Sequence, residues 1–584
     1  MKKCRKLKEE ENILNLVIGE SYLGKIDNEY IVLNKKIKIP KKRLNFDFEN
    51  YKDDFVVVKI KKIIMPNEII ADCDSIQDYV IEEISSSEAE ICDINNIDET
   101  YIQKIVWIEG IIEKKIQTSG PLLLRVKDKT GSIILKIFSN GNRYTNLKEG
   151  DGIRAKIRVT LYDNQIEGEI LELKKINYDL EKVNQKIIEN AKTSREQFSI
   201  ESEVYKRMLP LFVNAAFEIK KAIYEERPIL MRHHADCDGY SGALALEVSI
   251  IQMMKEIHRD EKKIWTHYSR IPMKTPFYDY SECTKDIAFF IDESLRFGNK
   301  EPLVICIDFG SSIESLLSYK KLKLFDCKII VIDHHLSCFE EFEKIKANVD
   351  ILINPHLFNG NEKITAGMLS YELSLFIREH NLKHLPIISG FGDRSDSNEF
   401  HQYCKSYSEE DLNFYKKLSE VIDFESYHLR NIEGRGYING LFTDQKLQKK
   451  MVEVIYPQLE EMWREYEVII EKNKKIVKEN PLVVVLENIN IINDFPSPGK
   501  ITGFAKDLLK KELKKDNVVI LYVYDEGIVL RSEILDLKLQ ERIKYLQNKY
   551  PEFLIEGGGH SKAGSIRFLK LGKEKILQEV LNWF

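Results

Sequence analysis

The chain has 584 residues, more than one hydrophobic core usually supports, so its length predicts about three to five domains. Hydrophobic residues make up 43% of it and charged residues 31%, which argues against a disordered or low-complexity protein. The formal net charge of −6 excludes a uniformly basic protein, yet residues 1–70 carry 16 Lys and Arg against 11 Asp and Glu, a charge of +5 that leaves −11 for the remainder.

Targeting and disulfide signals are both weak. Residues 13–18 are apolar but too short, and too close to Glu9, Glu10 and Glu11, for a signal peptide. No run approaches the roughly 18 apolar residues that a membrane-spanning helix needs. The nine cysteines include no Cys-x-x-Cys pair, which disfavours a disulfide framework and a thiolate zinc site. We therefore expect a soluble, cytoplasmic protein that does not bind membranes.

Residues 1–75 predict a small β-barrel of the nucleic-acid-binding type. Short stretches of β-branched and aromatic residues at 30–33, 55–60 and 69–71 are separated by polar turns. The basic cluster here is compatible both with attraction to nucleic acid and with an ordinary solvated face, and the sequence leaves both open. Its members are Lys35, Lys36, Lys38, Lys41, Lys42 and Arg43.

Residues 76–178 predict a second barrel, an OB-fold. Five strands are expected at 105–112, 122–126, 132–138, 153–161 and 165–173. Such barrels bind single strands through a basic groove and stacked aromatic rings. Candidate contact residues, whose faces the sequence does not define, are Lys127, Lys136, Phe138, Arg143, Tyr144, Arg154 and Arg158.

The rest of the chain predicts two α/β units joined by helices. Residues 179–225 are expected to be a helical connector. Within 226–404, apolar strands at 228–232, 303–307 and 328–332, with a helix at 241–257, predict a parallel sheet buried on both faces. Residues 405–480 are predicted as a second helical connector, and 481–584 as a smaller α/β unit with strands at 482–486, 518–524, 528–531 and 565–569.

Acidic and imidazole side chains follow four apolar segments of the larger α/β unit. Loops converge at the carboxyl ends of strands in open α/β sheets, so we expect these side chains to meet. Each segment alone is compatible with an ordinary turn, but all four in this order are hard to attribute to coincidence. They are His234-Ala235-Asp236-Cys237-Asp238-Gly239, Asp308-Phe309-Gly310, Asp333-His334-His335 and Gly392-Asp393-Arg394-Ser395-Asp396.

Such a cluster implies metal ions. Several carboxylates brought together without cations would be strongly unfavourable, so either they lie apart or metal neutralises them. Mixed carboxylate and imidazole ligation suits Mn²⁺. Two ions roughly 3.5–4 Å apart would polarise a phosphodiester, generate hydroxide near neutral pH and stabilise the leaving oxygen. The pattern therefore predicts a two-metal phosphoesterase.

A glycine-rich string precedes the last predicted strand. Gly557, Gly558 and Gly559 would expose backbone N–H groups to a phosphate, and His560 and Lys562 would add donors. A tight structural turn is the alternative, and the glycines alone do not decide between them.

Together these motifs resemble the DHH phosphoesterase superfamily. Asp333-His334-His335 is the tripeptide that names it, and the string from Gly557 resembles the hallmark of its DHH-associated C-terminal domain. The likeness is to the RecJ-like branch with added N-terminal OB-type barrels, as in archaeal members. It implies a multidomain α/β protein: a DHH parallel-sheet domain and a smaller C-terminal α/β DHH-associated domain, preceded by two small all-β barrels.

The resemblance also implies roles for the site residues. Two Mn²⁺ or Mg²⁺ ions would be bound by Asp236, Asp238, Asp308, His334 and Asp393, with Asp308 bridging and His234 as a further ligand or supporting residue. The catalytic residues would be His335 and Asp333, with His335 contacting the scissile phosphate or orienting a ligand. Substrate would be bound by Arg531, Gly557, Gly558, Gly559, His560 and Lys562.

The function implied is exonucleolytic hydrolysis of single-stranded DNA or RNA, with replication or repair proteins as partners. Other branches of the superfamily hydrolyse very short or cyclic oligonucleotides, and some relatives have lost the ligands and act as scaffolds. The two barrels favour the long-strand substrate, because a mononucleotide would not need them. The complete ligand set argues against a scaffold.

Overall fold

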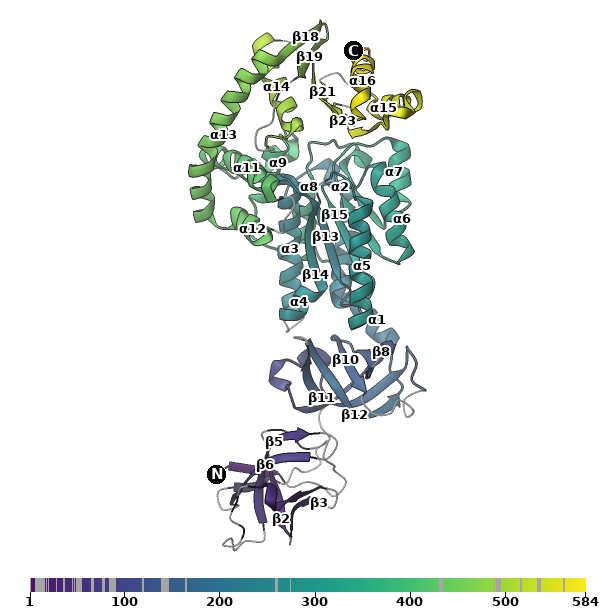
Figure 1. Ribbon diagram of the computed structural model, residues 1–584, viewed down its shortest axis with the longest axis vertical. Coiled ribbons are helices and arrows are strands. Elements are labelled where there is room, and N and C mark those ends of the chain that lie inside the picture. The colour runs from purple at the N-terminus through teal and green to yellow at the C-terminus, as the bar shows by residue number, and fades with distance from the viewer. Residues whose placement is uncertain are drawn as a thin grey trace.

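The computed structural model describes residues 2–5, 16, 18, 20–27, 29–34, 37–44, 46, 48, 55–64, 68–75, 79–82, 91–117, 120–137, 146–162, 165–257, 261–273, 275–429, 434–487, 489, 495–514, 517–532, 537–559 and 562–584. They form an elongated molecule with the β-rich units at one end, a small α/β unit at the other, and the parallel-sheet unit between them (Figure 1). The predicted fold class is confirmed.

The first unit is a seven-stranded sheet. Its strands pair in the order β4-β3-β2-β1-β7, with β5 against β2 and β6 against β5. Buried Ile37 and Ile39 alternate with exposed Lys38, the period of two expected of a strand with one face in the core. Lys35 and Lys36 lie outside the described residues. The strands are β1 (Lys2–Arg5), β2 (Ser21–Ile26), β3 (Tyr30–Asn34), β4 (Ile37–Pro40), β5 (Phe55–Ile64), β6 (Glu68–Ser75) and β7 (Tyr79–Glu82).

The second unit is a closed five-stranded barrel in the order β10-β12-β11-β8-β9. All five predicted strands are present. The largest extensions beyond the predicted ranges are in β8 and β12, which continue to pair with β9 and β11 through polar residues such as Lys114 and Lys174. The strands are β8 (Ile105–Gln117), β9 (Leu122–Lys127), β10 (Ser132–Ile137), β11 (Gly152–Tyr162) and β12 (Gln165–Ile176).

The segment predicted as the first connector holds α1 (Leu180–Ala191) and α2 (Glu203–Tyr224). The buried face of α2, with Tyr205, Phe212 and Ile219, packs in the same core as the parallel sheet. This helix is therefore part of the α/β unit rather than a spacer.

Five parallel strands form the central sheet, in the order β14-β13-β15-β16-β17. Every residue of β15 is buried, which explains its continuous apolar sequence. The sequence missed β14 because it contains Ser, Arg and Pro, and β17 because it has three residues. The strands are β13 (Ile229–His234), β14 (Tyr268–Met273), β15 (Leu303–Ile307), β16 (Lys328–Ile332) and β17 (Ile351–Ile353).

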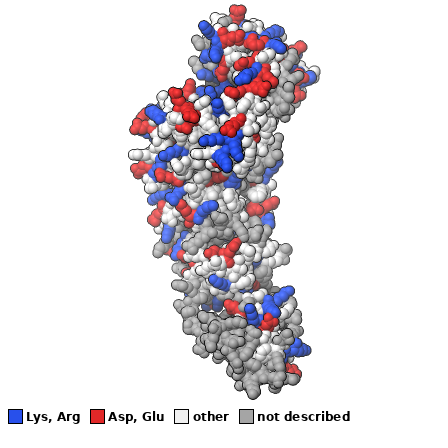
Figure 2. Space-filling model, turned by 90° about the vertical axis from the view of Figure 1, so that its left-hand side faces the viewer, with Lys and Arg blue, Asp and Glu red and all other residues white. Residues whose placement is uncertain are grey.

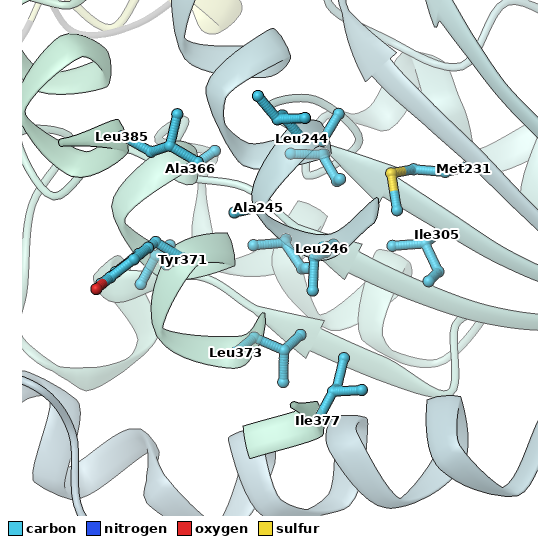
Figure 3. Packing of buried hydrophobic residues seen from close by; sticks show 14 of the residues in the cluster. Met231, Leu244, Ala245, Leu246, Ile305, Ala366, Tyr371, Leu373, Ile377 and Leu385 are labelled. Atoms are coloured by element: carbon cyan, nitrogen blue, oxygen red, sulfur yellow. The ribbon is translucent and has the colours of Figure 1, made fainter. Parts of the chain in front are cut away.

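Helices cover both faces of this sheet. On one face Leu246 of α3 lies near Ile305 of β15 and Leu373 of α8, in a cluster that also contains Leu244 (Figure 3). A second cluster, with Val304, Ile329 and Phe342, fills the other face. Because the strands are parallel, their carboxyl ends all lie on the same side of the sheet. The helices are α3 (Cys237–Ile257), α4 (Glu261–His267), α5 (Tyr280–Phe297), α6 (Leu316–Leu324), α7 (Phe339–Lys346), α8 (Ala366–Ile377), α9 (Leu385–Gly392) and α10 (Asn398–Cys404).

Three helices lead to the C-terminal unit: α11 (Glu409–Leu429), α12 (Arg435–Thr443) and α13 (Gln445–Asn473). Its six-stranded sheet has the order β18-β19-β20-β21-β23-β22 and begins inside the predicted connector, since β18 is a polar edge strand. Its elements are β18 (Lys474–Glu479), β19 (Leu482–Glu487), α14 (Pro498–Leu513), β20 (Val518–Tyr524), β21 (Gly527–Ser532), α15 (Leu539–Lys549), β22 (Glu556–Gly559), β23 (Ala563–Arg567) and α16 (Lys573–Leu581).

Over the described residues, the structure contains no helix that combines the length and the apolar character required to cross a bilayer.

Candidate metal centre

The first loop of the site joins β13 to α3. His234 ends the strand, and the Nδ1 of its ring lies 2.6 Å from Asp236 Oδ2. Gly239 is required at the turn, because a Cβ there would collide with the carbonyl oxygen of His234. Asp238, in the first turn of α3, is fully buried. The loop therefore presents two carboxylates at different depths.

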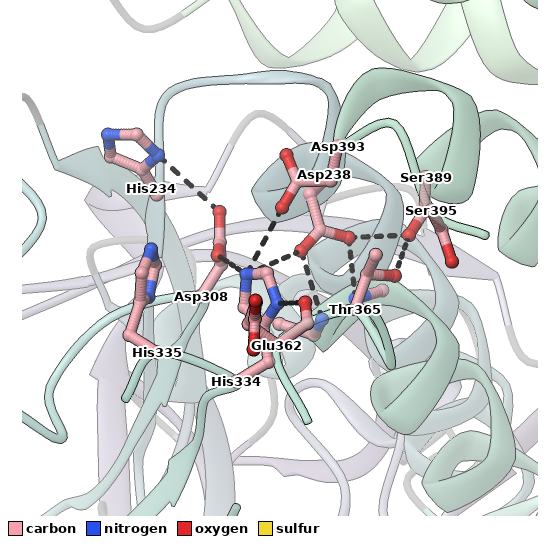
Figure 4. Close-up of polar contacts among 12 residues, drawn as sticks. His234, Asp238, Asp308, His334, His335, Glu362, Thr365, Ser389, Asp393 and Ser395 are labelled. Atoms are coloured by element: carbon pink, nitrogen blue, oxygen red, sulfur yellow. Dashed lines mark hydrogen bonds and ion pairs between the residues drawn. The ribbon is translucent and has the colours of Figure 1, made fainter. Parts of the chain in front are cut away.

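Asp238 is held by the N-terminus of α8. Its carboxylate accepts hydrogen bonds from the N–H groups of Ala366 (2.9 Å) and Gly367 (2.8 Å) and from the Ser389 hydroxyl (Figure 4). These donors orient the carboxylate toward the other acidic side chains. The sequence carried no signal for them.

Asp308 and Asp393 come from two further segments. Asp308 follows β15 directly with φ = 62°, a left-handed conformation that Asp tolerates, and its N–H donates to the carbonyl of Ile332 (2.8 Å). Asp393 caps the C-terminus of helix α9. The fourth acidic segment thus reaches the site from a helix, whereas the other three follow strands.

The tripeptide after β16 divides its side chains between different partners. Asp333 Oδ2 accepts the N–H of Ser311 (2.8 Å), and Asp333 Oδ1 accepts the His334 N–H (2.8 Å) and lies 2.6 Å from His335 Nδ1. Asp333 therefore orients the loop and His335, while His334 faces the other carboxylates. His233, by contrast, is fully buried against Tyr240 and does not join the site.

The side chains gather into two groups joined by Asp308. His234, Asp236 and Asp308 offer ligand atoms within 4.8 Å of one another, as do Asp238, His334 and Asp393, and Asp308 forms a third such group with His334 and His335. Asp308 Oδ2 lies 3.4 Å from His234 Nδ1, and Asp308 Oδ1 lies 3.2 Å from His334 Nε2 (Figure 4). The two oxygens of one carboxylate therefore face different donor groups, the arrangement that a bridging ligand requires.

Burial divides the site into a floor and an opening. The side chains of Asp238, Asp308 and His334 are 0%, 2% and 5% exposed. Those of Asp236 and Asp393 are both 31% exposed. Ions and substrate can therefore approach from the side of the exposed ligands.

The carboxylates are electrostatically crowded. Burial and the charges of Asp308 and Asp393 raise the pKa of Asp238 well above its ordinary value. Burial and Asp236 likewise raise the pKa of Asp308. Burial opposes ionisation of Asp393 too, but His334 holds the pKa of that carboxyl below its ordinary value. Divalent cations would relieve this repulsion and keep all the carboxylates ionised.

The orientation of His334 fits a metal ligand. Its Nδ1 lies 2.6 Å from the carbonyl oxygen of Glu362, and because a carbonyl can only accept, Nδ1 carries a hydrogen. Its Nε2 lies 3.2 Å from both Asp308 Oδ1 and Asp393 Oδ2. Burial opposes a charge on the ring, but Asp308 and Asp393 raise the pKa of His334 well above its ordinary value, so without a metal ion Nε2 also holds a proton. A metal ion would take the place of that proton, and a carbonyl on the other ring nitrogen is the usual support for a metal-bound histidine.

Arginines border the opening on the side of the C-terminal unit. A Cβ built on Gly503 of α14 would lie 3.4 Å from Arg394 Nη1 and 3.5 Å from Arg531 Nε, so the two guanidinium groups are close neighbours. Burial and Arg394 lower the pKa of Arg531, whereas Asp393 raises it. The Arg531 Nε is buried without a hydrogen-bond partner among the described residues. Arg394 was not predicted as a site residue, although it adjoins Asp393 in the sequence.

The glycine-rich string forms part of a β-hairpin. Gly557, Gly558 and Gly559 lie in β22 and pair with β23, which in turn pairs with the strand that carries Arg531. Close packing accounts for some of the glycines, since a Cβ on Gly557 would lie 2.5 Å from the carbonyl oxygen of Ser565. Lys562 accepts the Ser532 N–H at its carbonyl (2.7 Å). His560 lies outside the described residues.

The predicted contact cations of the barrel that the structure describes are paired with carboxylates. Lys127 lies in a buried network with Glu113, and the others contact neighbouring strands. In the face shown in Figure 2, charges of both signs are interspersed over the described surface. Phe138, Arg143 and Tyr144 lie outside the described residues. The remaining pairs are Lys136–Glu167, Arg154–Glu109 and Arg158–Glu169.

Comparison with known proteins places the chain in a family. No protein-family model matches it. It is 30% identical over 541 residues to the uncharacterised protein MJ1198 of Methanocaldococcus jannaschii, a match that covers 84% of this chain and 70% of that protein. The solved DHH domain of PF0399, described as a member of the s1p family of ribosomal proteins, is 34% identical with a TM-score of 0.63, and the match covers 69% of this chain and 96% of that one.

A more distant match is a RecJ exonuclease bound to manganese. It is 13% identical with a TM-score of 0.41, and the match covers 63% of this chain and 93% of that one. This likeness is too low to indicate function by itself. The DHH tripeptide follows a central parallel strand, and the first two matches extend over more than two thirds of this chain. Both observations indicate the same superfamily. The chain belongs to the DHH phosphoesterase superfamily.

Proposed function

We propose that the protein is a RecJ-like exonuclease that hydrolyses phosphodiester bonds of single-stranded DNA or RNA with two divalent metal ions. The observation that carries the proposal is Asp308, whose two oxygens face two separate groups of ligand atoms. Mn²⁺ is the preferred ion and Mg²⁺ the alternative, because the donors are carboxylates and imidazoles without thiolates.

The ions would be held at the strand ends, one beside His234 and Asp236 and the other beside Asp238, His334 and Asp393, with Asp308 shared. Bound there, they would polarise the phosphodiester and supply hydroxide near neutral pH. The complete donor set, and the position of His334 Nε2 among the carboxylates, support catalysis over a role as a scaffold.

The remaining residues would position the substrate. Asp333 holds His335 through Nδ1, and this ring would contact the scissile phosphate or orient a metal ligand. The unpartnered Nε of Arg531 supports phosphate binding at the opening, next to Arg394. The strand β22 glycines, Lys562 and His560 are the further proposed substrate contacts.

A second candidate is a phosphodiesterase of very short or cyclic oligonucleotides. In OB-folds the face formed by the second and third strands commonly binds the oligonucleotide. Here β9 and β10 carry Arg125, Lys127 and Ser132, and these residues contact the catalytic unit instead. Occupation of that face favours a substrate that reaches the metal centre without the barrel.

Cleavage of end-labelled strands tests the proposal. DNA and RNA of equal sequence, labelled at the 5′ or the 3′ end, should be shortened stepwise with Mn²⁺ and remain intact with EDTA. Asp308→Ala should lower the rate by more than about 100-fold. Loss of a residue that only supports a metal ligand costs up to about 100-fold, and loss of a shared ligand should cost more. Asp326→Ala, in an exposed turn, is the matched control and should keep the rate.

Two results would count against the exonuclease. If wild type leaves both strands intact with Mn²⁺, or Asp308→Ala shortens them as fast, the proposal of an exonuclease at this site is wrong. If a cyclic dinucleotide is hydrolysed while a 30-residue strand neither reacts nor competes, the second candidate holds. Binding to replication or repair proteins in the cytoplasm is part of the same proposal, and copurification with the Asp308→Ala variant tests it.

A further inference from the structure

Helix α14 of the C-terminal unit is linked to two loops of the candidate metal centre, the loop with Asp236 and Asp238 and the loop with Asp393. Its inward residues Ile501, Ala505 and Leu509 pack in the core of the C-terminal sheet, so the helix moves with that sheet. Its other side carries Lys500, which pairs with Asp423 of the connecting helix α11, and Asp507, which pairs with Arg394 of the DHH unit. The helix is therefore a direct mechanical link between the C-terminal unit and the metal centre.

The first contact reaches the loop between Asp236 and Asp238. Asp423, on α11, accepts the N–H of Cys237 with Oδ1 at 2.9 Å. Its other oxygen, Oδ2, pairs with Lys500. Cys237 separates the two aspartates in the chain, so the Asp423 carboxylate fixes the backbone from which both project. Its side chain is 10% exposed, so few water molecules can replace these partners.

The position of Lys500 is not explained by the stability of its own helix. It is the third residue of α14, where the helix dipole disfavours a cation. Asp423 offsets that cost, and Phe495 lies 5.9 Å from the ammonium group. Ion pairs of this kind contribute little net stability but define how two elements fit together.

The second contact reaches the loop that carries Asp393. Arg394 Nη1 lies 2.5 Å from Asp507 Oδ2, and its carbonyl accepts from Lys363 Nζ (2.8 Å). Both side chains of the pair are about half exposed, so this contact is the weaker of the two. Helix α14 is therefore linked to both loops at the same time.

We propose that Asp423 and Lys500 are positioning residues, which couple docking of the C-terminal unit to the geometry of the metal-binding loop at Asp236 and Asp238. The inference rests on the metal centre of the proposed function but not on the substrate. When the C-terminal unit is docked, Lys500 holds the Asp423 carboxylate on the Cys237 N–H. When it leaves, the carboxylate loses its cation and the loop loses its support.

Two mechanisms predict opposite signs for removal of the lysine. If Lys500 acted only through its charge, its loss would remove a positive charge near the ions and tighten Mn²⁺ binding. If it positions the loop, its loss weakens binding, because loss of residues that support metal ligands typically lowers affinity about 10–100-fold.

The test is Mn²⁺ affinity of the full chain without substrate, from the electron paramagnetic resonance signal of free Mn²⁺. We expect Lys500→Met to weaken binding by at least about tenfold, and the control Lys511→Met, an exposed lysine of the same helix, to leave it unchanged. Asp423→Asn keeps an oxygen for the Cys237 N–H and should lose less affinity than Asp423→Ala. Circular dichroism checks that each variant folds; if Asp423→Ala does not, Lys500→Met and Asp423→Asn decide.

The outcomes separate this inference from the proposed function. Unchanged or tighter Mn²⁺ binding in Lys500→Met overturns the positioning role, even if wild type cleaves strands. Weaker binding in Lys500→Met supports it, even if no strand is cleaved. If Asp423→Asn loses as much affinity as Asp423→Ala, the hydrogen bond to Cys237 is not the route, and the inference is wrong.

Discussion

The three residues of the Asp333–His335 tripeptide have three different surroundings. Asp333 accepts from backbone N–H groups and contacts His335, whereas the Nε2 of His334 faces carboxylates. Asp333 does not belong to any of the groups of potential ligands among the described residues. Its proposed contribution to hydrolysis is therefore through the orientation of His335.

Asp333→Asn should separate orientation from metal binding. Whichever way the new amide turns, its NH₂ group faces a donor, either the Ser311 N–H or the His335 side. We expect strand cleavage to fall about 10–100-fold, while Mn²⁺ affinity changes only a few-fold. Cleavage rates and Mn²⁺ titration of the same preparations measure both. Asp326→Asn, the same change in an exposed turn, should alter neither, and parallel loss of rate and affinity would contradict the assignment.

His380 should make stability depend on pH. Burial and His384 lower the pKa of His380 to about 4. Its Nδ1 accepts the Leu382 N–H (3.2 Å), so protonation there breaks a hydrogen bond. In the unfolded chain the pKa is about 6.5, so this stability is complete above pH 6.5 and is lost as pH falls toward 4, by up to about 2 kcal/mol at pH 5.

Urea unfolding at pH 7 and pH 5 measures that loss. His380→Gln removes the titration, so the drop in the unfolding midpoint between the two pH values should be smaller in the variant than in wild type. Identical drops would show that folding does not lower the pKa of His380.

At the scale of elements, the barrel is joined to the α/β unit by buried charge. Glu226, between α2 and β13, accepts from the Ser132 N–H (3.0 Å) and pairs with Arg125. Arg125 also donates to Asn299 (2.8 Å), just ahead of β15. These partners precede the strands, so the barrel docks at their amino ends.

Glu226→Ala should loosen this joint. It leaves Arg125 and Ser132 buried with fewer acceptors, and breaking a buried pair costs about 3–5 kcal/mol. We expect a lower midpoint temperature of thermal unfolding and faster proteolysis of the segment between the barrel and α2. The neighbouring Glu225→Ala, whose side chain is 19% exposed and pairs with Lys221 and Arg227, should cost less than about 1 kcal/mol. Equal losses would show that the joint does not depend on Glu226.

At the scale of the molecule, the barrel lies at the amino ends of the central strands and the metal centre lies at their carboxyl ends. The six residues of β13 separate them, about 20 Å at roughly 3.3 Å per residue. At about 3.4 Å per nucleotide, a helical strand needs about six nucleotides to cover that distance. A strand that contacts both must therefore be longer than the metal centre alone requires.

Strand length should therefore govern cleavage if the barrel contributes to binding. We expect kcat/KM to rise with length beyond about six nucleotides and then level off. Glu226→Ala should reduce this gain for long strands and leave dinucleotides unaffected. A flat dependence from dinucleotides to 30-residue strands would assign the metal centre to short substrates and the barrel to another role.

Much of the fold follows from the sequence because the strongest signals are local. The ranges 303–307, 328–332 and 518–524 were predicted as the strands observed, since a buried strand is a continuous apolar run. The meeting of His234, Asp236, Asp308 and His334 also follows, because parallel strands end at one edge. The sequence alone thus determined the α/β class and which acidic and imidazole side chains gather at the strand ends.

Only the tertiary structure decided which polar groups face one another. It brought Asp393 to the centre from a helix, buried Lys127 in the barrel joint beside Glu113, and placed Asp423 and Lys500 around the first loop. These contacts join residues tens to hundreds of positions apart. Periodicity reports the surroundings of a residue along its own strand or helix, whereas such pairings depend on how separate elements pack together.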